Sequence, residues 1–278
     1  MPNPDAAQFR SVPVRRVGRP PEGSTTDVAA VEEPLEVRLH GRPFAVIMRT
    51  PGDDRSLAAG FLFAEGVVRS AHDIGAVEHC HHPDRPEVWN IVDVYLLGSA
   101  AASIPQVLEE RRNVLATSSC GMCGRVAIES LQTRAARLPV ATRFEKDVVA
   151  RLPELLRERQ LGFEGTGGLH AAAIFTPDGA CELSAEDVGR HNAIDKVIGA
   201  RLLEDALPLS SRALAVSGRT SFEIVQKAWL GGIELICAVS APSSLAIEVA
   251  EEAGVTLLGF VRDGGFNIYS YPERIAGV

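Results

Sequence analysis

Apolar residues in the second half of the chain fall in short runs that alternate with segments of helical period. The short runs predict strands, and the periodic segments predict amphipathic helices. Strands are predicted at 169–175, 180–183, 213–216, 235–239 and 256–260, and helices at 144–160, 193–203, 222–230 and 245–253. Strands that alternate with helices need crossover connections, so this half is predicted to be an α/β domain with a parallel core sheet.

The first half has a different pattern. Alternating residues at 35–39 and 44–48 flank a turn and predict a hairpin. A helix is predicted at 57–64, with Asp53 or Asp54 as its cap and Gly66 at its end, and a strand at 88–97. We therefore predict a smaller α+β domain at 28–139, ahead of an α/β domain at 140–278. Residues 1–27 show no period and predict a mobile, solvated tail.

Composition narrows the class of protein. The chain has 278 residues and a formal net charge of −8, which argues against nucleic-acid binding through an overall positive field. It has no apolar run of bilayer length and no apolar signal-peptide core, so we expect a cytoplasmic protein without a membrane partner. Its five scattered cysteines do not resemble a secreted disulfide framework.

Two of those cysteines, Cys120 and Cys123, form a CxxC motif flanked by glycines. Residues 125–138 have apolar positions that suit an amphipathic helix, so the motif is predicted at or just before a helix N-terminus. Unpaired N–H groups there favour a thiolate, which is both a nucleophile and a metal ligand. Cys120 and Cys123 are therefore the candidate reactive residues.

The CxxC motif is compatible with three functions. A structural zinc site needs two further ligands at a suitable spacing, and no second CxxC exists. A zinc deaminase needs H-x-E followed later by P-C-x-x-C, whereas His170 follows these cysteines and Ser119 precedes Cys120. A dithiol site for redox exchange or sulfur transfer needs no further ligand, and the motif by itself does not separate those two functions. No permanently bound metal is expected.

Polar segments follow three of the predicted strands in the second half. Ligands of open α/β sheets bind beyond the carboxyl ends of the strands, where helix N-termini favour anions. Each segment alone is typical of a helix cap or a turn, and Thr220 with Glu223 has capping-box spacing. Three in succession favour a site for a phosphate-bearing ligand. The segments are 217–221, with Ser217 and Arg219; 240–244, with Ser240; and 262–265, with Arg262, Asp263, Gly264 and Gly265.

Two further polar clusters have simple structural explanations. Residues 186–192 are typical of a surface loop capped by His191 or Asn192, and a site there would require His170, Arg190 and His191 to converge. The run His79-Cys80-His81-His82 cannot direct all its side chains at one metal ion without a special loop, so a solvated loop is favoured.

Several sequence blocks together resemble the FdhD (FdhD/NarQ) family, the sulfur-carrier proteins required for formate dehydrogenase activity. They cover nearly all of the chain after the tail, in the order expected for the family. The blocks are Thr50-Pro51, Gly60-Phe61-Leu62 and Glu65-Gly66; Ser118-Ser119-Cys120-Gly121-Met122-Cys123-Gly124; Gly168-Leu169-His170-Ala171-Ala172; Glu186-Asp187-Val188-Gly189-Arg190-His191-Asn192-Ala193-Ile194-Asp195-Lys196; Ser217-Gly218-Arg219; and Gly259-Phe260-Val261-Arg262.

The resemblance implies a cytidine-deaminase-like fold in the second half, without zinc chemistry, and a homodimer. It implies that Cys120, with Cys123 as its partner, accepts sulfur from a cysteine desulfurase as a persulfide. The acceptor implied is the molybdenum or tungsten centre of a bis(molybdopterin guanine dinucleotide) cofactor, bound as cargo before or during its insertion into formate dehydrogenase. The family's cofactor-binding segment maps onto Phe260, Val261, Arg262, Asp263, Gly264 and Gly265. Ser217, Arg219, Ser240, His170 and Arg190 are added as candidate cofactor contacts.

Two other functions stay open. A thiol–disulfide oxidoreductase would cycle a Cys120–Cys123 disulfide without a sulfur donor. A non-enzymatic molybdenum-cofactor chaperone would bind guanine nucleotide and tolerate the loss of both thiols.

Overall fold

The computed structural model describes residues 8–18, 20, 22–80, 90–116 and 135–278. The strands are β1 (Phe9–Arg16), β2 (Gly23–Ala30), β3 (Glu33–Leu39), β4 (Arg42–Arg49), β5 (Ile74–Cys80), β6 (Ile91–Leu96), β7 (Phe144–Glu145), β8 (His170–Phe175), β9 (Cys181–Asp187), β10 (Ala213–Val216), β11 (Leu235–Ala238), β12 (Thr256–Arg262), β13 (Gly265–Ser270) and β14 (Ile275–Ala276). The helices are α1 (Asp54–Glu65), α2 (Gly98–Ala116), α4 (Lys146–Arg157), α5 (Leu161–Thr166), α6 (Arg190–Leu203), α7 (Phe222–Leu230) and α8 (Ser244–Ala253), with short 3-10 turns η1 (Ala71–Asp73) and η2 (Pro272–Arg274).

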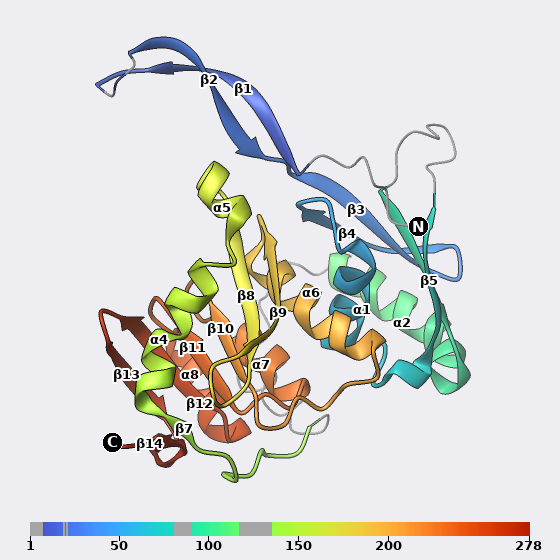
Figure 1. Ribbon diagram of the computed structural model, residues 1–278. Coiled ribbons are helices and arrows are strands. Elements are labelled where there is room, and N and C mark those ends of the chain that lie inside the picture. Colours follow the sequence, from blue (N-terminus) through green and yellow to red (C-terminus); the bar gives the residue numbers. More distant parts are fainter. Residues whose placement is uncertain (1–7, 19, 21, 81–89, 117–134) are drawn as a thin grey trace.

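The second half contains a six-stranded sheet in the order β13-β12-β11-β10-β8-β9 (Figure 1). The predicted parallel pairing is confirmed for β10, β11 and β12, which α7 and α8 connect. The outer strands differ from the prediction, because β8 pairs antiparallel with β10 and β13 pairs antiparallel with β12. The sheet is therefore mixed. Tight turns join β8 to β9 and β12 to β13 and make each of these pairs antiparallel. Since α6 then connects β9 to a β10 that runs in the same direction as β9, β8 is antiparallel to β10 as well.

Helices cover both faces of this sheet. On one face, α4 packs Val149, Leu152 and Leu156 against alternate residues of the strands. On the opposite face, α6, α7 and α8 pack against the intervening residues. Alternation of buried side chains on two faces explains why each central strand reads as an uninterrupted apolar run.

The first half forms a four-stranded sheet in the order β4-β3-β6-β5. The predicted hairpin is confirmed as β3 and β4, and the predicted helix as α1. Asp53 is the N-cap residue of α1 but makes no side-chain capping bond, while Gly66 closes the helix in a left-handed conformation. Helix α2 and strand β5 were not predicted.

The two halves meet where α1 crosses α6. A Cβ atom at Gly60 would lie 2.0 Å from the backbone oxygen of Asp195, and one at Gly199 would lie 1.9 Å from that of Ser56. Only glycine permits two helix backbones to approach so closely. One cluster of buried side chains accordingly includes residues of β3, α1, α6 and β10.

Two expectations about the ends of the predicted domains were wrong. Residues 9–16 and 23–30, most of them assigned to a tail without secondary structure, form the antiparallel pair β1–β2, which extends away from the body in Figure 1. A helix was predicted at 125–138, but its last residues, 135–138, are not helical. Residues 125–134 lie outside the described residues. Among the described helices, none is long and apolar enough to span a membrane.

Candidate functional site

The parallel strands β10, β11 and β12 end at one edge of the six-stranded sheet, and the antiparallel strand β8 begins there. Ser217, directly after β10, exchanges two bonds with Ala171 of β8. Its Oγ accepts the Ala171 N–H at 2.8 Å, and its own N–H donates to the Ala171 oxygen at 3.0 Å. Ser217 thus fixes the edge where the predicted site residues meet.

Three predicted site segments converge at this edge. A Cβ atom built on Gly218 would lie 3.4 Å from His170 Nδ1 and 3.9 Å from Arg190 Cδ. Among the described residues, no acceptor reaches the buried Nε of Arg190. The cluster therefore places an arginine and a histidine side by side at the sheet edge, and the Nε of the arginine is a buried donor without a partner in the described structure.

The two histidines of the site favour the neutral form. Burial lowers the pKa of His170, and the charge of Arg190 lowers it further, while Asp187 acts in the opposite direction. Burial also lowers the pKa of His191, against the opposing effect of Glu223. An anion bound here would reverse part of this shift, because it would favour the protonated imidazole.

The surface loop predicted for residues 186–192 is wrong. Helix α6 begins at Arg190, Gly189 is its N-cap, and neither His191 nor Asn192 caps it. Asp187, at the end of β9, is fully buried. The segment is a tight corner between a strand and a helix.

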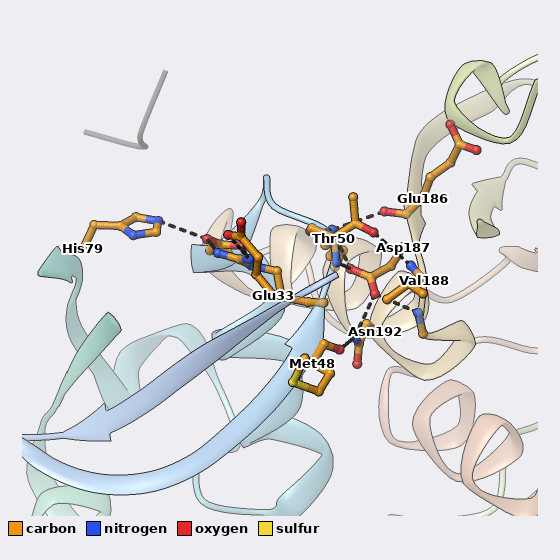
Figure 2. Close-up of polar contacts among 12 residues, drawn as sticks. Glu33, Met48, Thr50, His79, Glu186, Asp187, Val188 and Asn192 are labelled. Atoms are coloured by element: carbon orange, nitrogen blue, oxygen red, sulfur yellow. Dashed lines mark hydrogen bonds and ion pairs between the residues drawn. The ribbon is translucent and has the colours of Figure 1, made fainter. Parts of the chain in front are cut away.

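The corner is held by a polar cluster that joins the two halves of the chain (Figure 2). Asp187 accepts from Lys196 Nζ at 2.8 Å, the Thr50 N–H at 3.2 Å, and Asn192 Nδ2 and the Gly189 N–H at 2.8 Å each. These four donors fill the acceptor capacity of one carboxylate.

The other members of this cluster are also paired. Lys196 Nζ donates to the backbone oxygens of Thr50 at 3.1 Å and Glu186 at 3.2 Å. Thr50 Oγ1 accepts the Val188 N–H at 3.2 Å. Thr50, which directly follows β4, therefore connects the first half of the chain to the corner where Arg190 and His191 lie.

Nearby, His79 does not lie in the predicted solvated loop. Its side chain at the end of β5 is 3% exposed, and its Nε2 is 3.9 Å from Asp54 Oδ2 (Figure 2). Asp54 in turn pairs with Arg49 Nε at 2.8 Å. Within the described ranges, no group of three or more His, Cys, Asp or Glu side chains could hold a metal ion.

Two ion pairs connect the first turns of α6 and α7. His191 Nδ1 lies 3.0 Å from Glu223 Oε2, and one helical turn further Asp195 Oδ1 lies 2.5 Å from Lys227 Nζ. Burial raises the pKa of Asp195 to about 6, although Lys227 opposes the shift. The pairs align both helix N-termini at the same sheet edge.

The predicted Thr220–Glu223 capping box is not formed. Ser221 is the N-cap of α7, and in the described structure the buried Thr220 Oγ1 has no hydrogen-bond partner. Glu223 pairs with His191 instead. A partner 32 positions away in the chain leaves no local signal, which is why the sequence pattern missed it.

Backbone bonds connect the next two polar segments to this edge. The Thr220 N–H donates to Ala241 oxygen at 3.2 Å, and the Phe260 N–H donates to Ser240 oxygen at 3.3 Å. Ser243 Oγ accepts the Ala246 N–H at 3.2 Å, so this segment does form an ordinary helix cap. The predicted segments therefore lie side by side.

The predicted cofactor segment 260–265 comprises the last residues of β12, the two-residue turn Asp263-Gly264 and the first residue of β13. Phe260 has a φ of +54° and is 37% exposed, and the guanidinium of Arg262 lies 5.9 Å from the centre of its ring. Asp263 and Gly264 both have positive φ, as a two-residue turn between antiparallel strands requires. Val261 is fully buried, so it is not placed to contact a ligand.

Arg219, Arg262, Asp263, Gly264 and Gly265 are exposed, and Ser240 is half-buried. The two predicted reactive residues, Cys120 and Cys123, lie outside the described residues. The remaining cysteines are unsuited to thiolate chemistry, because burial raises the pKa of all three. They are Cys80, Cys181 and Cys237.

Comparisons with known proteins identify a single family. The model of the FdhD/NarQ family matches residues 30–276. A sulfur carrier protein FdhD of Streptomyces coelicolor is 46% identical over 271 residues, covering 94% of this chain and 95% of the relative. One of Anaeromyxobacter sp. strain K is 47% identical over 259 residues, covering 91% and 90%.

A solved structure is also similar. It is the crystal structure of a candidate formate dehydrogenase accessory protein from Desulfotalea psychrophila, with a TM-score of 0.72, 25% identity, and coverage of 96% of this chain and 98% of that one. The mixed α/β fold is thus shared over nearly the whole length. By the family model and by its relatives, the chain belongs to the FdhD/NarQ family.

Proposed function

We propose that this protein is a sulfur carrier that accepts sulfane sulfur from a cysteine desulfurase as a persulfide on Cys120, with Cys123 as its partner. The acceptor is the molybdenum centre of a bis(molybdopterin guanine dinucleotide) cofactor, and the product is needed for formate dehydrogenase activity. Membership of the FdhD/NarQ family over residues 30–276 carries this proposal. The relatives are named sulfur carrier proteins.

The three cysteines that the structure describes support the choice of the CxxC pair as the persulfide carrier. A persulfide forms when a thiolate attacks the outer sulfur of a donor persulfide, so a low thiol pKa and solvent access are needed. Burial raises the pKa of Cys80, Cys181 and Cys237 and disfavours each of them. The CxxC pair, with flanking glycines, is the better candidate.

The sheet edge supports the choice of cargo. Its polar groups suit the phosphates of the pterin dinucleotide, with Arg190 and His170 at the centre and the exposed Arg219 and Arg262 at the rim. The exposed ring of Phe260 offers a flat apolar surface on which a guanine base can stack. The cofactor is bound as cargo, and its metal centre is the substrate that accepts the sulfur.

The remaining parts of the proposal concern organisation. The second half adopts a cytidine-deaminase-like arrangement in which Cys120 and Cys123 take no part in zinc chemistry. The protein acts as a cytoplasmic homodimer. These parts rest on family membership and on the order of strands in the six-stranded sheet.

Mass spectrometry tests the central step. Full-length protein incubated with a cysteine desulfurase and cysteine is expected to gain one sulfur on the peptide that contains Cys120. Cys120→Ala should abolish the gain, and Cys181→Ala is the matched control that should retain it. Sulfur on neither cysteine of the CxxC motif would contradict the proposal.

The same samples separate the alternatives. A Cys120–Cys123 disulfide that cycles without a sulfur donor would indicate an oxidoreductase. Full formate dehydrogenase activity in cells that carry Cys120→Ala, with guanosine diphosphate binding retained, would indicate a chaperone in which the thiols are incidental.

A further inference from the structure

A serine, a histidine and a glutamate lie in series at the sheet edge. His191 Nε2 is 3.2 Å from Ser221 Oγ, and His191 Nδ1 is 3.0 Å from Glu223 Oε2. The carboxylate thus orients the ring with a protonated Nδ1, which leaves Nε2 to accept the hydroxyl proton. This is the nucleophile, base and orienting-group order of serine hydrolases, recognised by geometry and not by chain position.

His191 has the protonation state that a general base needs. Burial, Arg190, Lys227 and His170 lower its pKa, and Glu223 opposes them. The imidazole is therefore neutral at pH 7. Its side chain is 31% exposed, so a substrate can reach it.

Ser221 differs from an ordinary capping serine. Both Ser221 and Ser243 are N-cap residues, but Ser243 Oγ accepts the Ala246 N–H whereas Ser221 Oγ makes no capping bond. The Ser221 hydroxyl is directed to the histidine instead.

The first turn of α7 also supplies donors for a developing negative charge. Bonds to the Ser221 oxygen begin at the N–H of Ile224, so the N–H groups of Phe222 and Glu223 precede the first intrahelical bond. Such donors beside a nucleophile can stabilise an oxyanion.

We propose that Ser221, His191 and Glu223 form a second reactive centre that hydrolyses a small carboxylic ester whose anionic end faces Arg190 and His170. This activity goes beyond sulfur transfer and uses neither cysteine of the CxxC motif.

The reaction proceeds in two balanced steps. Ser221 Oγ bonds to the ester carbonyl carbon as its proton passes to His191 Nε2, and the carbon–oxygen bond to the leaving alcohol breaks as His191 returns the proton to that alcohol. Water then attacks the acyl-serine with His191 as base, which releases the carboxylic acid and restores the Ser221 hydroxyl.

A fluorophosphonate probe tests the proposal. Full-length protein treated with the probe and digested is expected to carry the phosphonyl mass on Ser221 and none on Ser243. Labelling should fall roughly 100-fold or more in His191→Gln, in the range typical for loss of a general base, and less in Glu223→Gln. Its rate should be close to maximal at pH 7 and decline only at pH values below the usual histidine pKa of about 6.5, because the pKa of His191 is lowered.

Controls distinguish chemistry from folding. Ser221→Ala should remove the label, while Ser243→Ala, altered at the equivalent cap of α8, should keep it. Thermal unfolding of each variant shows whether the protein is folded. Equal labelling of Ser221 and Ser243, no label on Ser221, or labelling of folded His191→Gln at the wild-type rate would overturn the proposal.

Discussion

Two polar clusters lie side by side at the start of α6, and they differ in how fully their polar groups are hydrogen-bonded. Around Asp187, the carboxylate and the ammonium of Lys196 are both fully paired inside the protein, and they are buried between the two halves of the chain. Around Arg190, a donor lacks a partner in the described structure, and two neutral histidines face the sheet edge. Buried polar groups that are fully paired hold a fold together, whereas incompletely paired ones are available to a ligand.

The largest expected effect comes from breaking the paired cluster. Asp187→Ala leaves the ammonium of Lys196 buried without its carboxylate, and the free energy of unfolding should fall by about 3–5 kcal/mol in urea denaturation. Adding Lys196→Met should recover much of that loss, because the uncompensated charge is removed. The exposed Glu248 of α8 is the control, and Glu248→Ala should change stability by less than about 0.5 kcal/mol. A similar small change in Asp187→Ala would show that the cluster does not hold the two halves together.

Removing the guanidinium of Arg190 should change binding more than stability. Arg190→Gln should weaken guanosine diphosphate binding about 10- to 100-fold, since a hydrogen bond to a charged group contributes roughly 1.5–3 kcal/mol. Calorimetry measures the affinity. Arg201→Gln, at the other end of α6 where Arg201 pairs with Glu204, is the matched control and should bind normally. Unchanged affinity in Arg190→Gln would mean that the guanidinium of Arg190 does not bind a phosphate.

The smallest expected effect is a pH dependence. His170, His191 and His79 all have a pKa below the usual value of about 6.5, so below that pH each of them binds fewer protons in the folded chain than in the unfolded one. Burial raises the pKa of Asp195 to about 6, which acts in the opposite direction below that pH and offsets part of the effect of the three histidines. Stability should therefore decrease as the pH falls below 6.5 and be regained above it. Thermal unfolding between pH 5 and 8 measures this slope, which should be shallower in His170→Gln/His191→Gln, with His79 left to contribute. An identical slope in the double variant would assign the effect elsewhere.

The local patterns of the sequence predicted most of the second half. Strand β10 and helix α7 were predicted with the bounds that the structure shows, because a short apolar run and a 3.6-residue period are properties of neighbouring residues. The polar segments after the strands were also placed correctly at one sheet edge, since parallel strands share the direction of their ends.

Tertiary structure decided which polar residues are structural and which are open to a ligand. The sequence gives no sign that Asp187 is buried, because its partners Thr50 and Lys196 come from different segments. Nor does a local pattern join His191 to Ser221 and Glu223, which another helix contributes. Periodicity reports the solvent exposure of nearby residues, but pairing between distant side chains depends on how the sheets and helices pack.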